Sequence, residues 1–594
     1  MCRIAGMISK RVNPDELIAK VSLMCDSLKH GGPDDAGIFS DEKAHLVFGH
    51  RRLSIIDLSS NGHQPMADVQ QRVWITFNGE IYNYLEIKKE LLNIGVKFHS
   101  NTDTEVIINA YLQWGISSFS KLRGMFAFAL YDKEKAITLL VRDSTGVKPL
   151  YYYAEGGALS FASEIRAFKV AGIAGEADQS WPVRFLAFGH IPEPYTTLKN
   201  VFSLKKGHYL SWNHHTSKSQ IAPFYTAPDA DYITNAASAN EQIKTSLRIA
   251  VKRQLMADAP IGVFLSGGVD SSLVSLLANE QREQQLKTIS IYFNEKSYDE
   301  RTYQNIVSNQ ISGEKYTHLV QQQDFEEFFP RIISDMDMPT TDGINTWFIS
   351  KYAHEDGLKA VLSGVGADEL FGGYPSFNRI KYLQFLRKLP SGIFGAANYF
   401  QTDKYRKVSF LLQDHYLADY LLLRGLFVPI DIARILNMDV KQVCDILFNE
   451  DNIDLGPYDE EHAAWFETNL YMQNQLLRDT DVMSMSHGLE VRVPFLDEDF
   501  KQLAQNISPG IRFNKNTPKK ILIDSFKEIL PEPTWNRPKM GFTFPFQEWM
   551  GQHNEISNEK LYKGKFAQDV VLKFRSGQMH WSKVFALYQI QLHV

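Results

Sequence analysis

The segment at residues 259–278, APIGVFLSGGVDSSLVSLLA, most constrains how this chain can fold. The unbroken apolar run from Ile261 to Leu265 is typical of a strand that is covered on both faces. A serine and two glycines follow it, and Asp270 then opens an amphipathic stretch. A glycine turn between a strand and a helix binds anions, because unpaired backbone N–H groups and the helix dipole face the turn. The segment therefore predicts a phosphate-binding loop in an α/β domain.

This loop differs from the phosphate loop of kinases and GTPases, because the GK[ST] ending is absent. SGGVDSS instead resembles the pyrophosphate loop of enzymes that split ATP between its α and β phosphates and form an acyl-adenylate. The resemblance implies ATP as a substrate. An ordinary glycine turn before a helix is the alternative, and it requires all of these residue types to coincide by chance.

Composition predicts a globular protein with more than one domain. The chain has 594 residues, of which 44% are hydrophobic and 22% charged. The net charge of −6 gives no reason to expect nucleic acid or an anionic membrane as a partner. No apolar run approaches the roughly 18 residues that span a bilayer, and a signal-peptide core is absent, so we expect a cytoplasmic protein. The cysteines, Cys2, Cys25 and Cys444, have neither disulfide nor zinc spacing.

Cys2 is the first candidate catalytic residue. Removal of the initiator methionine would place a free α-amine beside the thiol of the same residue. Such an amine titrates near about pH 8, low enough to take the thiol proton and to return it to a leaving group. A cysteine at position 2 also occurs by chance, so the role depends on the residues that follow.

Alternating segments in the first 150 residues predict sheet strands. They are HLVFGHRRLSIID, QRVWITFNGEIYNY, GMFAFALYD and AITLLVRD, and NTDTEVIINAYLQWG predicts an N-capped helix. Together with CRIAGM and GPDD, the RLSIID, NGEIYN, TDTE and RGMFAFALYD motifs resemble the class II glutamine amidotransferase domain. The resemblance implies an N-terminal αββα sandwich of the Ntn type, in which two antiparallel sheets stack between helical layers.

The same resemblance implies roles for the glutaminase residues. Cys2 is the expected nucleophile, and Asn78 with the backbone N–H of Gly79 is the expected oxyanion hole. The residues expected to bind glutamine are Arg52, Leu53, Ile55, Asn78, Glu80 and Asp103. Arg52 would hold the carboxylate, and Glu80 with Asp103 would face the ammonium group.

Each of these residues taken singly has an ordinary structural explanation. An arginine at a sheet rim is often solvated, NG often forms a hairpin turn, and Asp103 could cap a helix. Their joint occurrence in this order favours the glutaminase. One departure is Gly31, which stands where the family usually has an arginine before GPD.

A second domain is predicted after the glutaminase. Residues 213–235 lose apolar periodicity and gather turn formers, so we assign 1–212 to the glutaminase, 213–235 to a linker and 236–594 to the second domain. LKTISIYF, THLVQ and KAVLSG alternate with helical segments, which predicts a doubly wound parallel sheet with added helices. Ligands of such sheets bind beyond the carboxyl ends of the strands, so polar loops and C-terminal helices should meet there.

Two acidic residues at that edge are the expected Mg²⁺ ligands. Asp270 lies in the glycine loop, and Asp368 lies in LSGVGADELFGGY. The ion prefers oxygen donors and stays with the departing pyrophosphate. Alternatively, the DEL sequence only begins a helix, and its acidic side chains interact with the helix dipole.

The order of motifs covers nearly the whole chain. A class II glutaminase, SGGVDSS, LSGVGADELFGGY and EVRVPFLD follow one another as in glutamine-hydrolysing asparagine synthetases, which this chain resembles. The resemblance implies that Lys539 faces the acyl-adenylate. The residues that it implies for the ATP and pyrophosphate site are Phe264, Ser266, Gly267, Gly268, Asp270, Ser271, Ser272, Ile291, Ser363, Gly364 and Lys519.

The implied reaction has two halves. The second domain adenylates a carboxylate with release of pyrophosphate, and ammonia freed from glutamine attacks the adenylate. An apolar passage between the domains would keep ammonia uncharged, although the sequence does not assign its lining. The expected ligands are thus glutamine, ATP, Mg²⁺ and a carboxylate acceptor, and the oligomeric state stays open, with a homodimer as one option.

Val365 and Val482 leave the acceptor open. The family has a glutamate after LSG, thought to accept a proton from ammonia, and often a basic residue at the second position, whereas a valine does neither. Aspartate is the first expectation, because the family acts on it. A different carboxylate, such as a sugar uronic acid, is the alternative. A binding protein that lost the synthetase reaction is a third hypothesis, against which Asp270, Asp368 and Lys539 argue.

Overall fold

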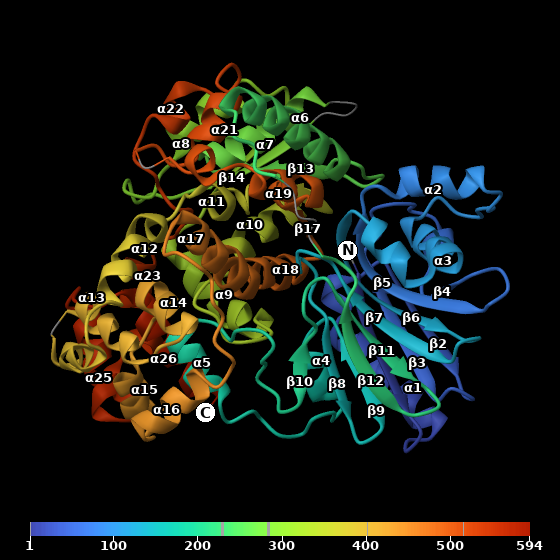
Figure 1. Ribbon diagram of the computed structural model, residues 1–594, viewed down its shortest axis with the longest axis horizontal. Coiled ribbons are helices and arrows are strands. Elements are labelled where there is room, and N and C mark those ends of the chain that lie inside the picture. Colours follow the sequence, from blue (N-terminus) through green and yellow to red (C-terminus); the bar gives the residue numbers. More distant parts are fainter. Residues whose placement is uncertain (1, 227–230, 282–285, 401, 515, 594) are drawn as a thin grey trace.

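The computed structural model describes residues 2–226, 231–281, 286–400, 402–514 and 516–593. Met1, whose removal would free the amine of Cys2, and residues 227–230 of the predicted linker lie outside the described residues. Figure 1 shows the antiparallel strands at the right, the parallel sheet at the top and a helical part at the lower left. The two-domain architecture predicted from the sequence is confirmed by these sheets.

The antiparallel part is a sandwich of two sheets. Within the described ranges, one sheet has the order β10-β8-β9-β1-β3-β2 and the other β12-β11-β7-β6-β5-β4. The first comprises β1 (Arg3–Ser9), β2 (Asp35–Asp41), β3 (Leu46–Arg52), β8 (Tyr151–Glu155), β9 (Ala158–Ala162) and β10 (Val201–Ser203). The second comprises β4 (Met66–Ala67), β5 (Val73–Ile81), β6 (Gly124–Asp132), β7 (Ile137–Arg142), β11 (His208–Asn213) and β12 (Lys218–Pro223).

Side-chain alternation explains how the layers stack. In β1, Ile4 and Ile8 point into the core between the two sheets, whereas Ala5 and Met7 point to the outer core that contains α1 (Pro14–Ser27). On the opposite outside, α3 (Asp103–Trp114) packs on β5, and the Thr102 hydroxyl caps it by accepting from the N–H of Glu105 at 3.2 Å. The layers are therefore helix, sheet, sheet and helix, as predicted.

The stretch predicted as a linker contains a strand. β12 pairs antiparallel with β11 from Asn213↔Lys218 to His208↔Pro223, so the sandwich extends beyond residue 212. The prediction was wrong here because β12 is an edge strand whose side chains are nearly all exposed, and such a strand needs no apolar alternation. The remaining predicted boundaries stay predictions.

The second domain is built on a parallel sheet. In the described residues its order is β15-β14-β13-β16-β17, and every neighbouring pair is parallel. The strands are β13 (Ile261–Phe264), β14 (Leu286–Tyr292), β15 (Gly313–Leu319), β16 (Ala360–Leu362) and β17 (Glu490–Arg492). The helices that cover and follow them include α6 (Ala236–Gln254), α7 (Val269–Glu280), α8 (Arg301–Ser308), α10 (Ile344–Glu355), α11 (Ala367–Phe371) and α19 (Glu498–Gln505).

One long helical run of the second domain reaches the sandwich at its C-terminal end. It consists of α17 (Glu460–Phe466), the π-helical η6 (Glu467–Leu476) and α18 (Leu477–Met485). Figure 1 shows α18 leading from the helical part towards the antiparallel strands. In the described part of the chain, no helix combines the length and apolarity needed to cross a membrane.

Candidate active sites

The amino end of the chain lies against β5. The backbone N–H of Cys2 donates to Oδ1 of Asn78 at 3.3 Å, and among the described residues Nδ2 of Asn78 has no hydrogen-bond partner. Gly79 has φ +151°, and a Cβ there would lie 2.1 Å from the carbonyl oxygen of Met125, so only glycine fits. Burial raises the pKa of the Cys2 thiol to about 11, so Cys2 needs a nearby base to become a nucleophile.

Arg52 is held at the end of β3 by backbone carbonyls. Its Nη1 donates to the carbonyl of Ser59 at 2.8 Å and its Nη2 to that of Asp57 at 2.5 Å. A Cβ at Gly62 would lie 1.8 Å from Nη2, so glycine is what allows the loop to wrap the guanidinium. Leu53 and Ile55 follow and are buried, in the apolar cluster that joins the domains.

Two buried carboxylates lie beside this site. Asp103 accepts from the N–H of Ile81 at 2.9 Å, and burial raises its pKa to about 6. Burial, together with Glu490 and Asp103, raises the pKa of Glu80 well above its usual value. Arg492 of the second domain lies 3.7 Å from Glu80 and 2.5 Å from Glu490. Burial thus disfavours the charged form of both carboxyl groups, and a ligand ammonium placed beside them would favour it.

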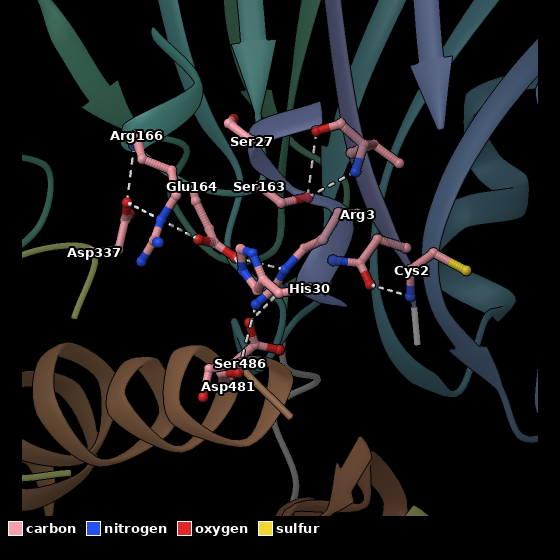
Figure 2. A network of polar contacts seen from close by, with 12 residues as sticks. Cys2, Arg3, Ser27, His30, Ser163, Glu164, Arg166, Asp337, Asp481 and Ser486 are labelled. Carbon is pink, nitrogen blue, oxygen red and sulfur yellow. Dashed lines mark hydrogen bonds and ion pairs between the residues drawn. The ribbon is translucent and has the colours of Figure 1, made fainter. Parts of the chain in front are cut away.

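Arg3, the residue after Cys2, joins the two domains. Figure 2 shows its guanidinium between Glu164 of the sandwich and Asp481 of α18, with the Cys2 sulfur pointing away from this network. The Nε–Oε1 distance to Glu164 is 2.8 Å, and the Nη1–Oδ2 distance to Asp481 is 2.6 Å. Lys148 adds a second cation 3.1 Å from Asp481. Arg3 is fully buried, so both ion pairs lie in a low-dielectric interior.

The Arg3 side chain also explains the departure at Gly31. A Cβ at position 31 would lie 2.8 Å from Cγ and 2.9 Å from Nε of Arg3. Arg3 therefore occupies the space into which any side chain at position 31 would extend. Sequence reasoning missed this residue, although an arginine beside the candidate nucleophile was a signal.

The glycine loop folds as predicted between β13 and α7. Gly267 has φ +80°, which favours glycine, and the Ser266 and Ser271 hydroxyls lie 2.9 Å apart. Gly268 forms the N-cap of α7 and leaves the helix N-terminus without a side-chain cap. Within the described residues, the buried Ser272 hydroxyl has no hydrogen-bond partner. These features suit an anion at the loop.

Lys519 brings the two candidate metal ligands together. Its Nζ lies 2.7 Å from Oδ2 of Asp270 and 2.8 Å from Oδ1 of Asp368, and Lys539 donates to Oδ2 of Asp368 at 2.6 Å. Burial by itself raises the pKa of Asp368, but the nearby ammonium groups of Lys519 and Lys539 hold this pKa below its usual value. The glycine loop, the loop after β16 and the C-terminal segments thus meet at the carboxyl ends of the strands.

The other residues predicted for ATP lie around this point. A Cβ at Gly364 would lie 2.9 Å from Cβ of Asp270, and the N–H of Ser363 donates to the carbonyl of Arg492 at 2.8 Å. Phe264 ends β13 half-buried, and Ile291 is buried in β14.

Sequence reasoning also missed Arg537 and Tyr374 beside this site. Arg537 donates to the Gly267 carbonyl at 3.1 Å and pairs with Glu300 at 2.6 Å. Nζ of Lys539 lies 4.6 Å from the centre of the Tyr374 ring. Arg537 lies two residues before the predicted Lys539, which was the available signal.

Val482 lines a small cavity of about 10 Å³ in the second domain. Its walls are Met336, Asp337, Met338, Thr340, Arg478, Asp479, Val482 and Met483. Burial raises the pKa of Asp479 to about 7. A neighbouring cavity, also of about 10 Å³, shares Met338 and Arg478 and is lined by Arg142 and Tyr151 of the sandwich, so it lies at the domain interface.

One apolar cluster spans both domains. It contains Leu53 and Met125 from the sandwich and Leu362 and Met485 from the second domain, and Val365 packs against it. Cys2 lines neither of these two cavities. The contact between the two domains therefore combines this apolar cluster with the buried ion pairs of Arg3 and Arg492.

Comparison with known proteins supports this arrangement. The family model described as glutamine amidotransferase domain matches residues 1–225, and the one described as asparagine synthase matches residues 242–584. Asparagine synthetase [glutamine-hydrolyzing] 1 of Bacillus subtilis is 30% identical over 571 residues, which cover 93% of this chain and 88% of the relative. Amidase chry2 of Gibberella zeae is 27% identical over 638 residues, which cover 94% of this chain and 91% of the relative.

An antiparallel sandwich with an amino-terminal cysteine, joined to a parallel sheet with a pyrophosphate-type loop, is the construction of a glutamine amidotransferase fused to a synthetase. The chain belongs to the glutamine-hydrolysing asparagine synthetase family. It is a ligase that forms a carbon–nitrogen bond with glutamine as the amido donor.

Proposed function

We propose that this chain hydrolyses glutamine at Cys2, adenylates a carboxylate at the glycine loop and transfers the ammonia between them. The observation that carries the proposal is the convergence of Asp270, Asp368 and two lysines at the carboxyl edge of the parallel sheet. A protein that kept only the fold would have no need to gather two carboxylates and two lysines at the edge where sheets of this kind bind their ligands.

In the glutaminase half, the α-amine of mature Cys2 would take the thiol proton, and the sulfur would attack the glutamine amide carbon. Nδ2 of Asn78, which has no hydrogen-bond partner in the part of the chain that the structure describes, is available to donate to the oxyanion. Each such donor stabilises the transition state by about 3 to 4 kcal/mol in comparable sites. Ammonia leaves with the returned proton, and water releases glutamate from the thioester.

In the synthetase half, the acceptor carboxylate would attack the α phosphorus of ATP and pyrophosphate would leave. The glycine loop N–H groups and Lys519 would face the phosphates, and Lys539 would face the adenylate. Ammonia then displaces AMP and forms the amide.

Asp270 and Asp368 would hold Mg²⁺. No group of three or more His, Cys, Asp or Glu side chains suited to a metal occurs among the described residues, and Mg²⁺ commonly uses one or two carboxylates completed by phosphates and water. The donor set therefore fits this ion, which when bound neutralises the departing pyrophosphate.

Aspartate is the first candidate acceptor, because the curated relatives are named as asparagine synthetases. A different carboxylate, such as a sugar uronic acid, is the second candidate. Val365 joins the apolar cluster, and Val482 lines a cavity with three methionines, so neither position offers a charge to the amino acid group of aspartate.

A screen of carboxylic acids for pyrophosphate release from ATP, with glutamine present, tests the proposal. We expect release with one acid and none without an acceptor. Release with a uronic acid and not with aspartate would replace the first candidate by the second. No release with any acid, while glutamine is hydrolysed, would favour a binding protein.

A further inference from the structure

The segment at residues 379–407 has an unusual charge for this chain. It contains seven Lys or Arg residues and a single acidic residue, Asp403, whereas the whole chain has a net charge of −6. Arg379, Lys381, Lys388 and Lys404 are exposed, and none forms an ion pair within the described residues. The net charge of the chain therefore conceals a local basic surface.

The same segment carries most of the exposed aromatic surface. Six Phe, Tyr or Trp side chains in the described part of the chain are more than a third exposed, and five of them lie here. They are Tyr382 at 62%, Phe385 at 69%, Tyr399 at 86%, Phe400 at 53% and Tyr405 at 56%. Ile393 adds an aliphatic side chain that is 50% exposed. Such a concentration of apolar side chains marks an interaction site.

The local fold directs these side chains to solvent. In α12 (Pro375–Leu386), Phe377, Ile380 and Leu383 are buried, whereas Tyr382 and Phe385 lie three residues apart on the exposed face. The chain continues into η4 (Ser391–Tyr399) and α13 (Asp403–Arg406), which pack against each other. Figure 1 shows α13 at the outer left edge, on the side away from the antiparallel strands.

We propose that this segment docks the protein on an anionic lipid bilayer. Aromatic rings interleaved with lysines and arginines are the residue types that bind at the interface between lipid head groups and acyl chains. A protein partner fits less well, because lysine is depleted in the centres of protein interfaces. Single-stranded nucleic acid would use the rings for stacking but would gain nothing from Ile393.

Docking would bring the synthetase site close to the membrane. α12 starts directly after Tyr374, whose ring lies 4.6 Å from Nζ of Lys539. Tyr382 lies roughly 12 Å farther along the helix axis, at about 1.5 Å per residue. The proposal does not depend on which carboxylate is the acceptor.

Co-sedimentation of the full chain with lipid vesicles tests the proposal. We expect binding to vesicles of phosphatidylglycerol and phosphatidylcholine, weaker binding at high salt, and little binding to phosphatidylcholine alone. Replacement of Lys381, Lys388 and Lys404 by Gln should weaken binding about 100-fold, at roughly fivefold for each charge. Phe385→Ser with Tyr399→Ser should weaken binding at every salt concentration.

Matched variants elsewhere on the surface are the controls. The exposed Lys97, Lys441 and Lys563 replaced by Gln, and Tyr232→Ser, should bind vesicles like the wild type. All variants should retain glutamine hydrolysis, which confirms that they fold.

Three results would overturn the proposal. The first is equal sedimentation of the wild type with neutral and anionic vesicles. The second is binding of single-stranded RNA without vesicle binding. The third is a wild-type dimer in light scattering that these substitutions dissociate while no vesicles are bound.

Discussion

The guanidinium of Arg3 contacts Asp481 at 2.6 Å and so fixes the strand that follows Cys2 to helix α18 of the synthetase domain. Asp481 directly precedes Val482, which lines a small cavity of the second domain. The residue next to the candidate nucleophile is thus ion-paired with the residue next to Val482, and this contact joins β1 to α18.

The Arg3–Asp481 pair should contribute to both stability and coupling. Asp481→Asn removes the negative charge that balances the buried side chains of Arg3 and Lys148. We therefore expect the apparent free energy of unfolding to fall by about 3 kcal/mol. The ratio of glutamine hydrolysed to amide formed should rise, because β1 is no longer held against α18. Urea unfolding and parallel assays of glutamate and AMP measure the two effects.

Asp499→Asn is the control for this variant. Asp499 also pairs across the domains, at 2.8 Å from Arg123, but its side chain is 43% exposed. Solvent screens such a pair, so its loss should change stability by less than about 1 kcal/mol and leave the ratio unchanged. Equal effects of both substitutions would contradict a special role for Arg3.

Cys2→Ala should abolish glutamine hydrolysis and leave amide synthesis from added ammonia. The reason is that the sulfur serves only the glutaminase half. Cys25→Ala, which removes another buried thiol, should keep glutamine hydrolysis. Glutamate release and ammonia-dependent AMP formation check the prediction, and loss of both activities in Cys2→Ala would show that the sites are not separate.

Asn78→Ala should lower kcat for glutamine hydrolysis by about 100- to 1000-fold, because an oxyanion donor is lost. KM should change little, since the donor acts mainly in the transition state. Steady-state glutaminase assays test this, and a rise in KM with unchanged kcat would assign Asn78 to ground-state binding.

The glutaminase should lose efficiency at acidic pH. Burial raises the pKa of Asp103 to about 6, so the side chain is charged above that pH and gains a proton below it. A protonated Asp103 no longer attracts the ammonium group of glutamine, and kcat/KM should therefore fall as pH drops below about 6. In Asp103→Asn, kcat/KM should be low at all pH values, without this acidic limb. If kcat/KM of the variant still falls below about pH 6, the titrating group is not Asp103.

Asp270→Asn should impair pyrophosphate release while glutamine hydrolysis continues. The substitution removes one of the two carboxylates that Lys519 joins. Asp524→Asn is a suitable control, because Asp524 forms an exposed pair with Lys520, next to Lys519 in the chain. Pyrophosphate release that survives in Asp270→Asn would remove Asp270 from the proposed metal site.

Local patterns were enough to predict much of the fold. The apolar run and glycines around Ser266 predicted β13, its turn and α7, because these elements depend on neighbouring residues. β12 was missed because an exposed edge strand carries no apolar periodicity. The role of Gly31 could not be predicted, since the space at that position is filled by Arg3, which is distant in the sequence.

By itself, the sequence determined the order of the two domains and the residue types at each site, because motif spacing and periodicity are local properties of the chain. Only the tertiary structure decided that Lys519 joins Asp270 to Asp368, that Arg3 meets Asp481, and that one apolar cluster spans both domains. Such contacts join residues hundreds of positions apart, and their partners are selected by burial and charge in the folded chain rather than by sequence spacing.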